Sequence, residues 1–256
     1  MEKETMHLIE IKELRKAFGP IVAVDGISFT VDKGDVLGFL GPNGAGKSTT
    51  MKMLSGFLPP DGGTALVNGH DIITDVIKVR RSLGYLAENA PAYDEMSAMG
   101  MLKFVCDARG IKGARKRQAI DKVAVSCAIT GVMHQQVGTL SKGYRRRLGL
   151  AQALIHDPDV LILDEPTDGL DPNQKHEVRK LIQSMASEKC IVISTHILEE
   201  ADALCNRIII IDQGRILVNE TPESLRSKHD GSLDTAFREL TGSSAKARAR
   251  ARGGAA

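Results

Sequence analysis

Residues 41–49 read Gly41-Pro42-Asn43-Gly44-Ala45-Gly46-Lys47-Ser48-Thr49 and fit the pattern G-x-x-x-x-G-K-[ST]. The run 35–40 before them, which is apolar after Asp35, predicts a buried parallel strand, and residues 48–58 carry apolar side chains at helical spacing. A glycine-rich turn between a strand and a helix N-terminus leaves several backbone N–H groups free to bind one anion. We therefore expect residues 41–49 to bind a nucleoside triphosphate, with Lys47 reaching the β- and γ-phosphates and the Ser48 hydroxyl binding Mg²⁺.

A second apolar run, residues 160–163, ends in two carboxylates, Asp164 and Glu165. The tip of a buried strand suits an acid that binds Mg²⁺ beside the first loop, and we expect Asp164 to do this. Glu165 is placed to orient and deprotonate a water molecule near the γ-phosphate. The alternative is that Glu165 is only a favourable charge at a helix N-terminus. Upstream, residues 140–147 predict the start of a helix, with Ser141 as its N-cap.

These motifs and their order resemble the ATP-binding subunits of ABC transporters, over nearly the whole chain to about Lys228. The resemblance implies a Walker A loop at residues 41–48 and a Walker B strand at residues 160–164, with Glu165 as the catalytic carboxylate. It also implies that His196, which follows Ser-Thr at a strand end, is the switch histidine that contacts the γ-phosphate. Without that context, His196 would be interpreted as a hydrogen-bonded core histidine.

The resemblance places the family's signature sequence at residues 140–144, where Ser141 and Gly143 match L-S-G-G-Q. It places the D-loop at residues 168–171. In this family the signature of one subunit lies over the Walker A loop of another, so ATP is bound between two copies. This implies that Ser141, Gly143 and Asp171 contribute to an ATP site across a homodimer, or across a dimer with a closely related ATPase subunit. Asp171 is also expected to cap the helix that begins at Pro172.

Two positions depart from the family pattern. Glu88 stands where the family has the Q-loop glutamine, which connects Mg²⁺ to the contact with the membrane domain. A carboxylate also offers oxygen to Mg²⁺, so we expect Glu88 to bind the metal, together with Ser48 and Asp164. In the signature sequence, Lys142 and Tyr144 replace glycine and glutamine.

Within the family, residues 84–88, 140–145 and 169–174 are most similar to ABC-2 type exporter ATPases, a group that includes drug-export, gliding-motility and polysaccharide-export systems. No stretch approaches the roughly 20 apolar residues that span a bilayer, and residues 1–5 do not resemble a signal peptide. Together with these features, the family resemblance implies a cytoplasmic protein, peripheral on the cytoplasmic face of the cell membrane. Its cofactors would be ATP and Mg²⁺, and its partners integral-membrane permease subunits.

Two other functions remain open at this point. One is a soluble ABC ATPase that acts in translation or DNA maintenance, but such relatives usually carry two cassettes, a long coiled-coil insertion or zinc modules. The other is a nucleotide-binding regulator without turnover, which the presence of Glu165 and His196 opposes. The formal net charge of +2 gives no strong field that would attract nucleic acid, and no nucleic-acid partner is expected. The four cysteines show no zinc-binding spacing.

The expected fold is α/β, a P-loop NTPase core with a mostly parallel sheet, an antiparallel β-subdomain and an inserted helical subdomain. The ATP-binding domain would comprise residues 1–241, with the helical signature subdomain at about 89–150 and a flexible basic tail at 242–256. The family resemblance implies that Phe18, in the antiparallel part, stacks on the adenine; the alternative is an ordinary core phenylalanine. We interpret residues 145–147, three consecutive arginines, as a solvated helix face.

Overall fold

The computed structural model describes residues 7–88 and 90–242 of the 256-residue chain. Two expectations lie outside the described residues: the absence of a signal peptide at residues 1–5, and the flexible basic tail, of which only residue 242 is described. In the part of the chain that the structure describes, no helix has both the length and the hydropathy needed to cross a bilayer.

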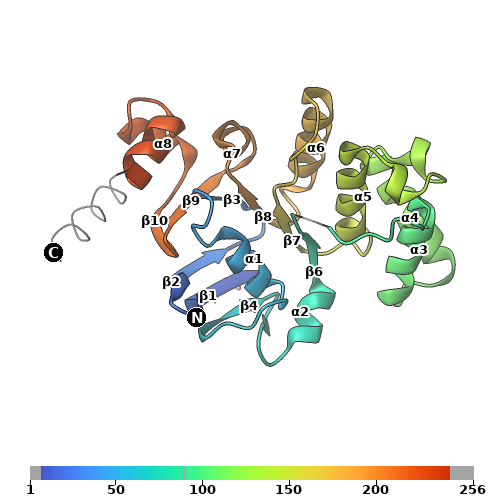
Figure 1. Cartoon of the computed structure of the whole chain (residues 1–256), viewed down its shortest axis with the longest axis horizontal. Helices are drawn as coiled ribbons and strands as arrows, with labels where there is room; N and C mark the ends of the chain where they lie inside the picture. The colour runs from blue at the N-terminus through green and yellow to red at the C-terminus, as the bar shows by residue number, and fades with distance from the viewer. Residues whose placement is uncertain (1–6, 89, 243–256) are drawn as a thin grey trace, which may run out of the picture.

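The central sheet has six strands in the order β10-β9-β3-β8-β7-β6 (Figure 1). All neighbouring strands are parallel except β9 and β10, which form an antiparallel hairpin. The strands in sheet order are Arg215–Glu220 (β10), Arg207–Asp212 (β9), Val36–Leu40 (β3), Cys190–Thr195 (β8), Val160–Asp164 (β7) and Leu83–Leu86 (β6). Every residue of β3, β7 and β8 is buried, because these strands are covered on both faces, and this accounts for their continuous apolar sequences.

A second, antiparallel sheet has the order β2-β1-β4-β5. Its strands in that order are Ile21–Val31 (β2), Ile9–Phe18 (β1), Gly62–Val67 (β4) and His70–Asp71 (β5). The turn between β4 and β5 is made by Asn68 and Gly69, whose φ angles of 50° and 75° are those of a hairpin turn. The antiparallel subdomain is therefore present as predicted.

Helix α1 (Lys47–Leu54) and the antiparallel sheet cover one face of the central sheet, and other helices cover the opposite face (Figure 1). Alternate residues of β3 enter two cores: Leu37 and Phe39 pack on the α1 side, while Val36 and Leu40 pack on the other. The remaining helices of the core part are Val76–Ser82 (α2), Pro172–Met185 (α6), Leu198–Leu204 (α7) and Pro222–Lys228 (α8), followed by helical residues 233–242.

Three helices form a separate layer at the end of the molecule farthest from α8 (Figure 1). They are Ala98–Ala108 (α3), Gly113–Ser126 (α4) and Lys142–Leu154 (α5), with 3₁₀ turns at Thr130–Val132 and Val137–Thr139 between α4 and α5. Helix α5 packs against β6 at the edge of the central sheet. The inserted helical part is thus present, although its division from the rest of the chain at about 89–150 stays a prediction.

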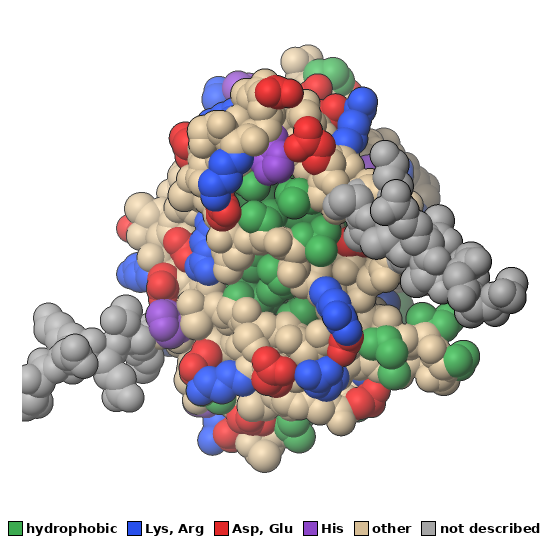
Figure 2. Space-filling view, turned by 90° about the vertical axis from the view of Figure 1, so that its left-hand side faces the viewer, with side chains coloured by type: hydrophobic (Ala, Val, Ile, Leu, Met, Phe, Trp, Pro, Cys, Tyr) green, Lys and Arg blue, Asp and Glu red, His purple; other side chains and the backbone are tan. Residues whose placement is uncertain are grey.

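The opposite end of the molecule carries β10 and α8, and Figure 2 views the molecule from that side. Hydrophobic side chains are visible in the middle of this face, and charged side chains surround them (Figure 2). Leu217 of β10 is among the exposed large hydrophobic residues, at 36%. This end of the molecule is distant from the helical layer that contains α5.

Candidate functional site

The glycine-rich loop connects β3 to α1 and lies against two other strands. A Cβ atom added to Gly46, whose φ is 109°, would lie 2.3 Å from the carbonyl oxygen of Ala23 in β2. A Cβ atom on Gly41 would lie 2.3 Å from the carbonyl oxygen of Ile211 in β9. Only glycine fits these two positions, so the loop conformation is fixed by the backbones on either side of it.

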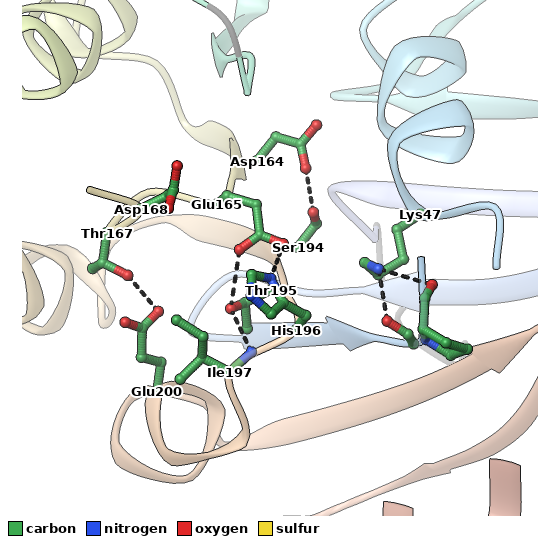
Figure 3. Close-up of polar contacts among 12 residues, drawn as sticks. Lys47, Asp164, Glu165, Thr167, Asp168, Ser194, Thr195, His196, Ile197 and Glu200 are labelled. Atoms are coloured by element: carbon green, nitrogen blue, oxygen red, sulfur yellow. Dashed lines mark hydrogen bonds and ion pairs between the residues drawn. The ribbon is translucent and has the colours of Figure 1, made fainter. Parts of the chain in front are cut away.

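Lys47, the first residue of α1, is only 7% exposed. Its ammonium group donates hydrogen bonds to the carbonyl oxygens of Gly41 (2.6 Å) and Pro42 (3.2 Å) (Figure 3). Burial lowers the pKa of Lys47, and the nearby carboxylates of Glu165 and Asp164 oppose that shift. The loop therefore holds a partly desolvated cation beside two acids, where it can interact strongly with a phosphate.

Asp164 ends β7 and is 1% exposed. The hydroxyl of Ser194, on the neighbouring strand β8, donates a hydrogen bond to its carboxylate (Figure 3). Because β7 and β8 are parallel and Asp164 pairs in register with Ser194, both side chains lie at the carboxyl edge of the sheet. This is the edge at which open α/β sheets bind their ligands.

Glu165 follows directly and has a left-handed backbone with φ of 51°. Its Oε1 atom lies 2.9 Å from Nδ1 of His196, and its Oε2 accepts a hydrogen bond from the Thr195 hydroxyl at 3.4 Å (Figure 3). The Glu165 side chain is 15% exposed and that of His196 is 56% exposed. The carboxylate is therefore held by groups at the end of β8, while His196 faces outward.

A cleft of about 590 Å³ brings most of the predicted site together. Its lining includes ten of the residues predicted from the sequence: Phe18, Asn43, Gly44, Gly46, Lys47, Ser48, Thr49, Glu88, Glu165 and His196. Gly41, Pro42 and Ala45 belong to the same loop but do not line the cleft. Phe18 is 50% exposed at its edge and is not an ordinary core residue.

The oxygen donors of the cleft fit Mg²⁺. Ser48 and Glu88 line it together, and Asp164 lines an adjoining cavity of about 500 Å³ that also contains Glu88. Among residues 7–88 and 90–242 there is no cluster of three or more His, Cys, Asp or Glu side chains able to bind a metal. Mg²⁺ does not require such a cluster, because it usually binds one or two protein oxygens together with substrate phosphates and water.

The signature residues do not join this cleft within the chain. Ser141 caps α5 by accepting a hydrogen bond from the backbone N–H of Tyr144 (3.3 Å), and Gly143 packs against the Gln174 side chain. Asp171 caps α6, with the backbone N–H of Gln174 donating to its Oδ1 atom at 2.9 Å. The two predicted helix caps are confirmed. In one copy of the chain, none of Ser141, Gly143 and Asp171 lines the cleft.

The prediction that residues 145–147 form a solvated helix face is wrong for two of the three arginines. Arg146 and Arg147 are only 7% and 8% exposed. Backbone carbonyl oxygens accept hydrogen bonds from the Nη atoms of both guanidinium groups, whereas each Nε is buried without a partner among the described residues. The two arginines lie at helical spacing from Leu150 and Leu154, which are both buried in α5. This spacing places the arginines on the inward face of the helix and could have indicated their burial.

Four further polar residues around the site were not predicted as site residues. Ser194 and Thr195 contact the carboxylates of Asp164 and Glu165. Asp168 lines the cleft, and its hydrogen bond with Lys142 (2.9 Å) lowers the pKa of its carboxyl. Glu200, only 2% exposed, accepts a hydrogen bond from Thr167 (Figure 3) and also pairs with Lys175.

Comparison with known proteins identifies the family. A family model described as ABC transporter matches residues 24–168, more than half of the chain. A second model, described as an AAA domain, matches the shorter segment 135–202. A solved structure, "Structure of ATP binding subunit of ABC transporter", aligns with a TM-score of 0.84 and 28% identity over 91% of this chain and 99% of that one. This agreement confirms the predicted α/β P-loop fold.

Two curated proteins are similar over most of this chain. "Probable multidrug ABC transporter ATP-binding protein YbhF" of Escherichia coli (strain K12) is 36% identical over 240 residues, which is 91% of this chain and 41% of YbhF. The chain therefore spans about two fifths of the length of YbhF. "Daunorubicin/doxorubicin resistance ATP-binding protein DrrA" of Streptomyces peucetius is 36% identical over 228 residues, which is 89% of this chain and 69% of DrrA. Together with the geometry of the loop and the strand ends, these matches show that the chain belongs to the family of ABC transporter ATP-binding domains.

Proposed function

We propose that this chain hydrolyses ATP to power an ABC-type exporter whose pore is formed by separate integral-membrane permease subunits. The observation that carries the proposal is the pairing of Glu165 with His196 in the cleft that also contains Lys47 and Ser48. A phosphate-binding loop alone needs no carboxylate opposite it, whereas hydrolysis needs a group that orients and deprotonates water. The names of YbhF and DrrA support export as the direction of transport.

In the proposed mechanism, residues 41–49 bind the phosphates of ATP and Phe18 stacks on the adenine. Glu165 orients and deprotonates the water that attacks the γ-phosphorus, and Lys47 offsets the charge that develops on the transferred phosphoryl group. His196 contacts the γ-phosphate and at the same time fixes the Glu165 carboxylate. Ser48, Asp164 and Glu88 would hold Mg²⁺, which when bound supplies further charge stabilisation. Positioning and electrostatics then account for most of the rate.

The positions of the signature residues support a site shared between two copies. Ser141 is exposed at the start of α5, and neither it nor Gly143 lines the cleft of its own chain. A second copy that presents its α5 N-terminus to the cleft would add backbone N–H groups and a helix dipole at the γ-phosphate. We propose a homodimer, or a dimer with a closely related subunit, that closes on two ATP molecules and reopens after hydrolysis.

An exposed groove between the helical layer and the core supports a permease partner. It has a volume of about 290 Å³, and its lining includes Phe57, Pro91 and Arg109. Phe57 is 72% exposed, which is unusual for a large aromatic side chain. Ala90 and Pro91, which line this groove, lie close in sequence to Glu88 in the cleft, so a permease bound here would respond to the nucleotide. The chain would then lie on the cytoplasmic face of the membrane.

The test has two parts. Purified protein should hydrolyse ATP only with Mg²⁺, and Lys47→Ala should bind ATP much more weakly; absence of turnover in the wild type contradicts the proposed enzyme. Isolation of the chain from membranes in mild detergent should then recover a multi-spanning membrane protein in constant ratio. Recovery with ribosomes or DNA instead would favour the soluble ABC ATPase that acts in translation or DNA maintenance.

A further inference from the structure

Arg146 connects three parts of the molecule that are distant in sequence. It lies in the first turns of α5, and its Nη1 atom donates to the carbonyl oxygens of Ala87 (2.7 Å) and Glu88 (2.8 Å). Its Nη2 atom donates to the carbonyl oxygens of Asp164 and Glu165, the latter at 2.6 Å. One guanidinium group therefore holds the loop that carries Glu88 and the end of β7 that carries Glu165.

The contacts of Arg146 are suited to holding the Glu88 loop and the end of β7 in fixed relative positions. The guanidinium is planar and presents its donors in a fixed fork, so the four carbonyl oxygens must keep one relative arrangement to be bound together. A lysine ammonium at the same place is a single point with three donors and cannot match that arrangement. Burial lowers the pKa of Arg146, and four carboxylates nearby favour its charged form, namely those of Asp164, Asp168, Glu165 and Glu88.

The backbone of Glu165 needs such support. Its left-handed φ of 51° is a conformation that persists in a non-glycine residue only where the surrounding contacts fix it. The Glu165 N–H donates to the Ser194 carbonyl oxygen (2.9 Å), and the Glu165 carbonyl oxygen accepts from the Asp168 N–H (3.1 Å). Arg146 adds the contacts that connect this strained residue to the helical layer.

We call the contacts of Arg146 with the carbonyl oxygens of Ala87, Glu88, Asp164 and Glu165 the clamp. The packing around the clamp leaves room for movement. A cavity of about 430 Å³ adjoins Arg146 and is lined by Glu88 and Asp168 as well. The Glu88 loop and the loop that follows β7 are therefore joined on this side by the Arg146 guanidinium rather than by dense packing. A displacement of α5 would move both loops through the same side chain.

We infer that Arg146 is a positioning residue that holds the Glu88 loop and the Asp164–Glu165 peptide in one relative arrangement. The catalytic carboxylate of Glu165 then follows the position of α5. The role of Arg146 in catalysis rests on the proposed ATP hydrolysis, whereas the hydrogen bonds of the clamp do not depend on it. Arg146 does not line the nucleotide cleft, so it acts through Glu165 and Glu88.

The first experiment tests the clamp without nucleotide. Amide hydrogen exchange is compared for wild type, Arg146→Lys and Arg147→Lys. Arg147 is a matched control because it is equally buried in α5 but donates to the Ala128 carbonyl oxygen (3.0 Å) and touches neither loop. We expect faster exchange at residues 83–88 and 164–168 in Arg146→Lys only. Equal exchange at these residues in the two variants would overturn the inference.

The second experiment measures steady-state ATP hydrolysis by the same proteins. For Arg146→Lys we expect kcat to fall by roughly 10–100-fold, the effect of a misplaced catalytic group, with little change in the KM for ATP. Arg147→Lys should keep kcat near the wild-type value, and a kcat equal in the two variants contradicts the positioning role. If Arg146→Lys fails to fold, Arg146→Gln removes the buried charge, retains two donors and carries the same expectations. An inactive wild type would refute the proposed function alone, because the exchange experiment still decides the clamp.

Discussion

The Oε1 atom of Glu165 lies 2.9 Å from Nδ1 of His196, so the two side chains predicted to act on one phosphate already form a pair. They come from the ends of adjacent parallel strands, β7 and β8. The sheet register therefore brings together residues 31 positions apart in the sequence.

The first prediction concerns Glu165 as the catalytic base. Glu165→Gln keeps the shape of the side chain but removes the proton acceptor, so ATP hydrolysis should fall by about 10²–10⁴-fold while ATP still binds. Turnover and equilibrium ATP binding are measured on the same preparation. Glu177→Gln, an exposed change on α6, serves as the control and should leave turnover unchanged. Normal turnover in Glu165→Gln would show that another group activates water.

The second prediction concerns the loop backbone. Gly46→Ala should abolish ATP binding, because its Cβ would lie 2.3 Å from the Ala23 carbonyl oxygen. Gly110→Ala also places alanine at a positive φ, +74°, but has no atom within 4 Å of the added Cβ. It should cost only about 1–2 kcal/mol of stability and leave ATP binding intact. Chemical denaturation and ATP titration of both variants separate the clash from the backbone strain.

The third prediction concerns the shared site. Lys47→Ala and Ser141→Arg should each inactivate a homodimer, because both of its sites contain one defect. A mixed dimer contains one intact site and one doubly damaged site, so mixing the variants should recover activity. If it does not, light scattering of Glu165→Gln at saturating ATP decides between two explanations. A monomer there excludes the shared site, whereas a dimer means that both sites must be intact together.

The fourth prediction concerns Glu88, which lines the cleft with Ser48. Glu88→Gln should leave ATP affinity nearly unchanged and raise the Mg²⁺ concentration needed for half-maximal hydrolysis, because a neutral amide oxygen is a weaker ligand for a hard cation. Mg²⁺ titrations of the hydrolysis rate test this. Superimposable curves for wild type and variant would mean that Glu88 does not bind the metal.

The fifth prediction concerns pH and stability. Burial lowers the pKa of His156 from the ordinary value of 6.5 to about 4, and its Nδ1 atom has no hydrogen-bond partner among the described residues. The unfolded chain therefore binds the proton more tightly than the folded one, so stability is retained above pH 6.5 and lost as the pH falls towards 4. The loss from this residue is roughly 3 kcal/mol across that window.

Urea denaturation at several pH values tests the prediction for His156. His156→Gln retains an amide donor for the Leu83 carbonyl oxygen, which His156 Nε2 contacts at 3.1 Å, but cannot titrate. We expect the stability of the variant to depend less steeply on pH between 6.5 and 4 than that of the wild type. Parallel pH profiles for the two proteins would contradict a buried neutral histidine.

The sequence by itself determined the features that depend on neighbouring residues. The loop at residues 41–49, the buried strands before it and before Glu165, and the caps Ser141 and Asp171 are each encoded within a few positions of the chain. Local encoding is sufficient there because a glycine-rich turn, an apolar run and an N-cap act on adjacent backbone groups. The helix after the loop ends at Leu54 rather than near residue 58, since Gly56 follows with a left-handed φ of 65°.

Only the tertiary structure decided which side chains and backbone groups the helices and loops bring close to the site. The short elements α2, β6 and α7 were not predicted, because each has seven residues or fewer and too little periodicity to detect. The burial of Arg146 depends on carbonyl oxygens 58 and 59 positions away, and the contact of Ser194 with Asp164 spans 30 positions. Backbone carbonyls occur at every residue and leave no pattern in the sequence. The helical spacing of Arg146 indicates that it faces inward, but the carbonyl oxygens that it binds are set by how α5, β6 and β7 pack.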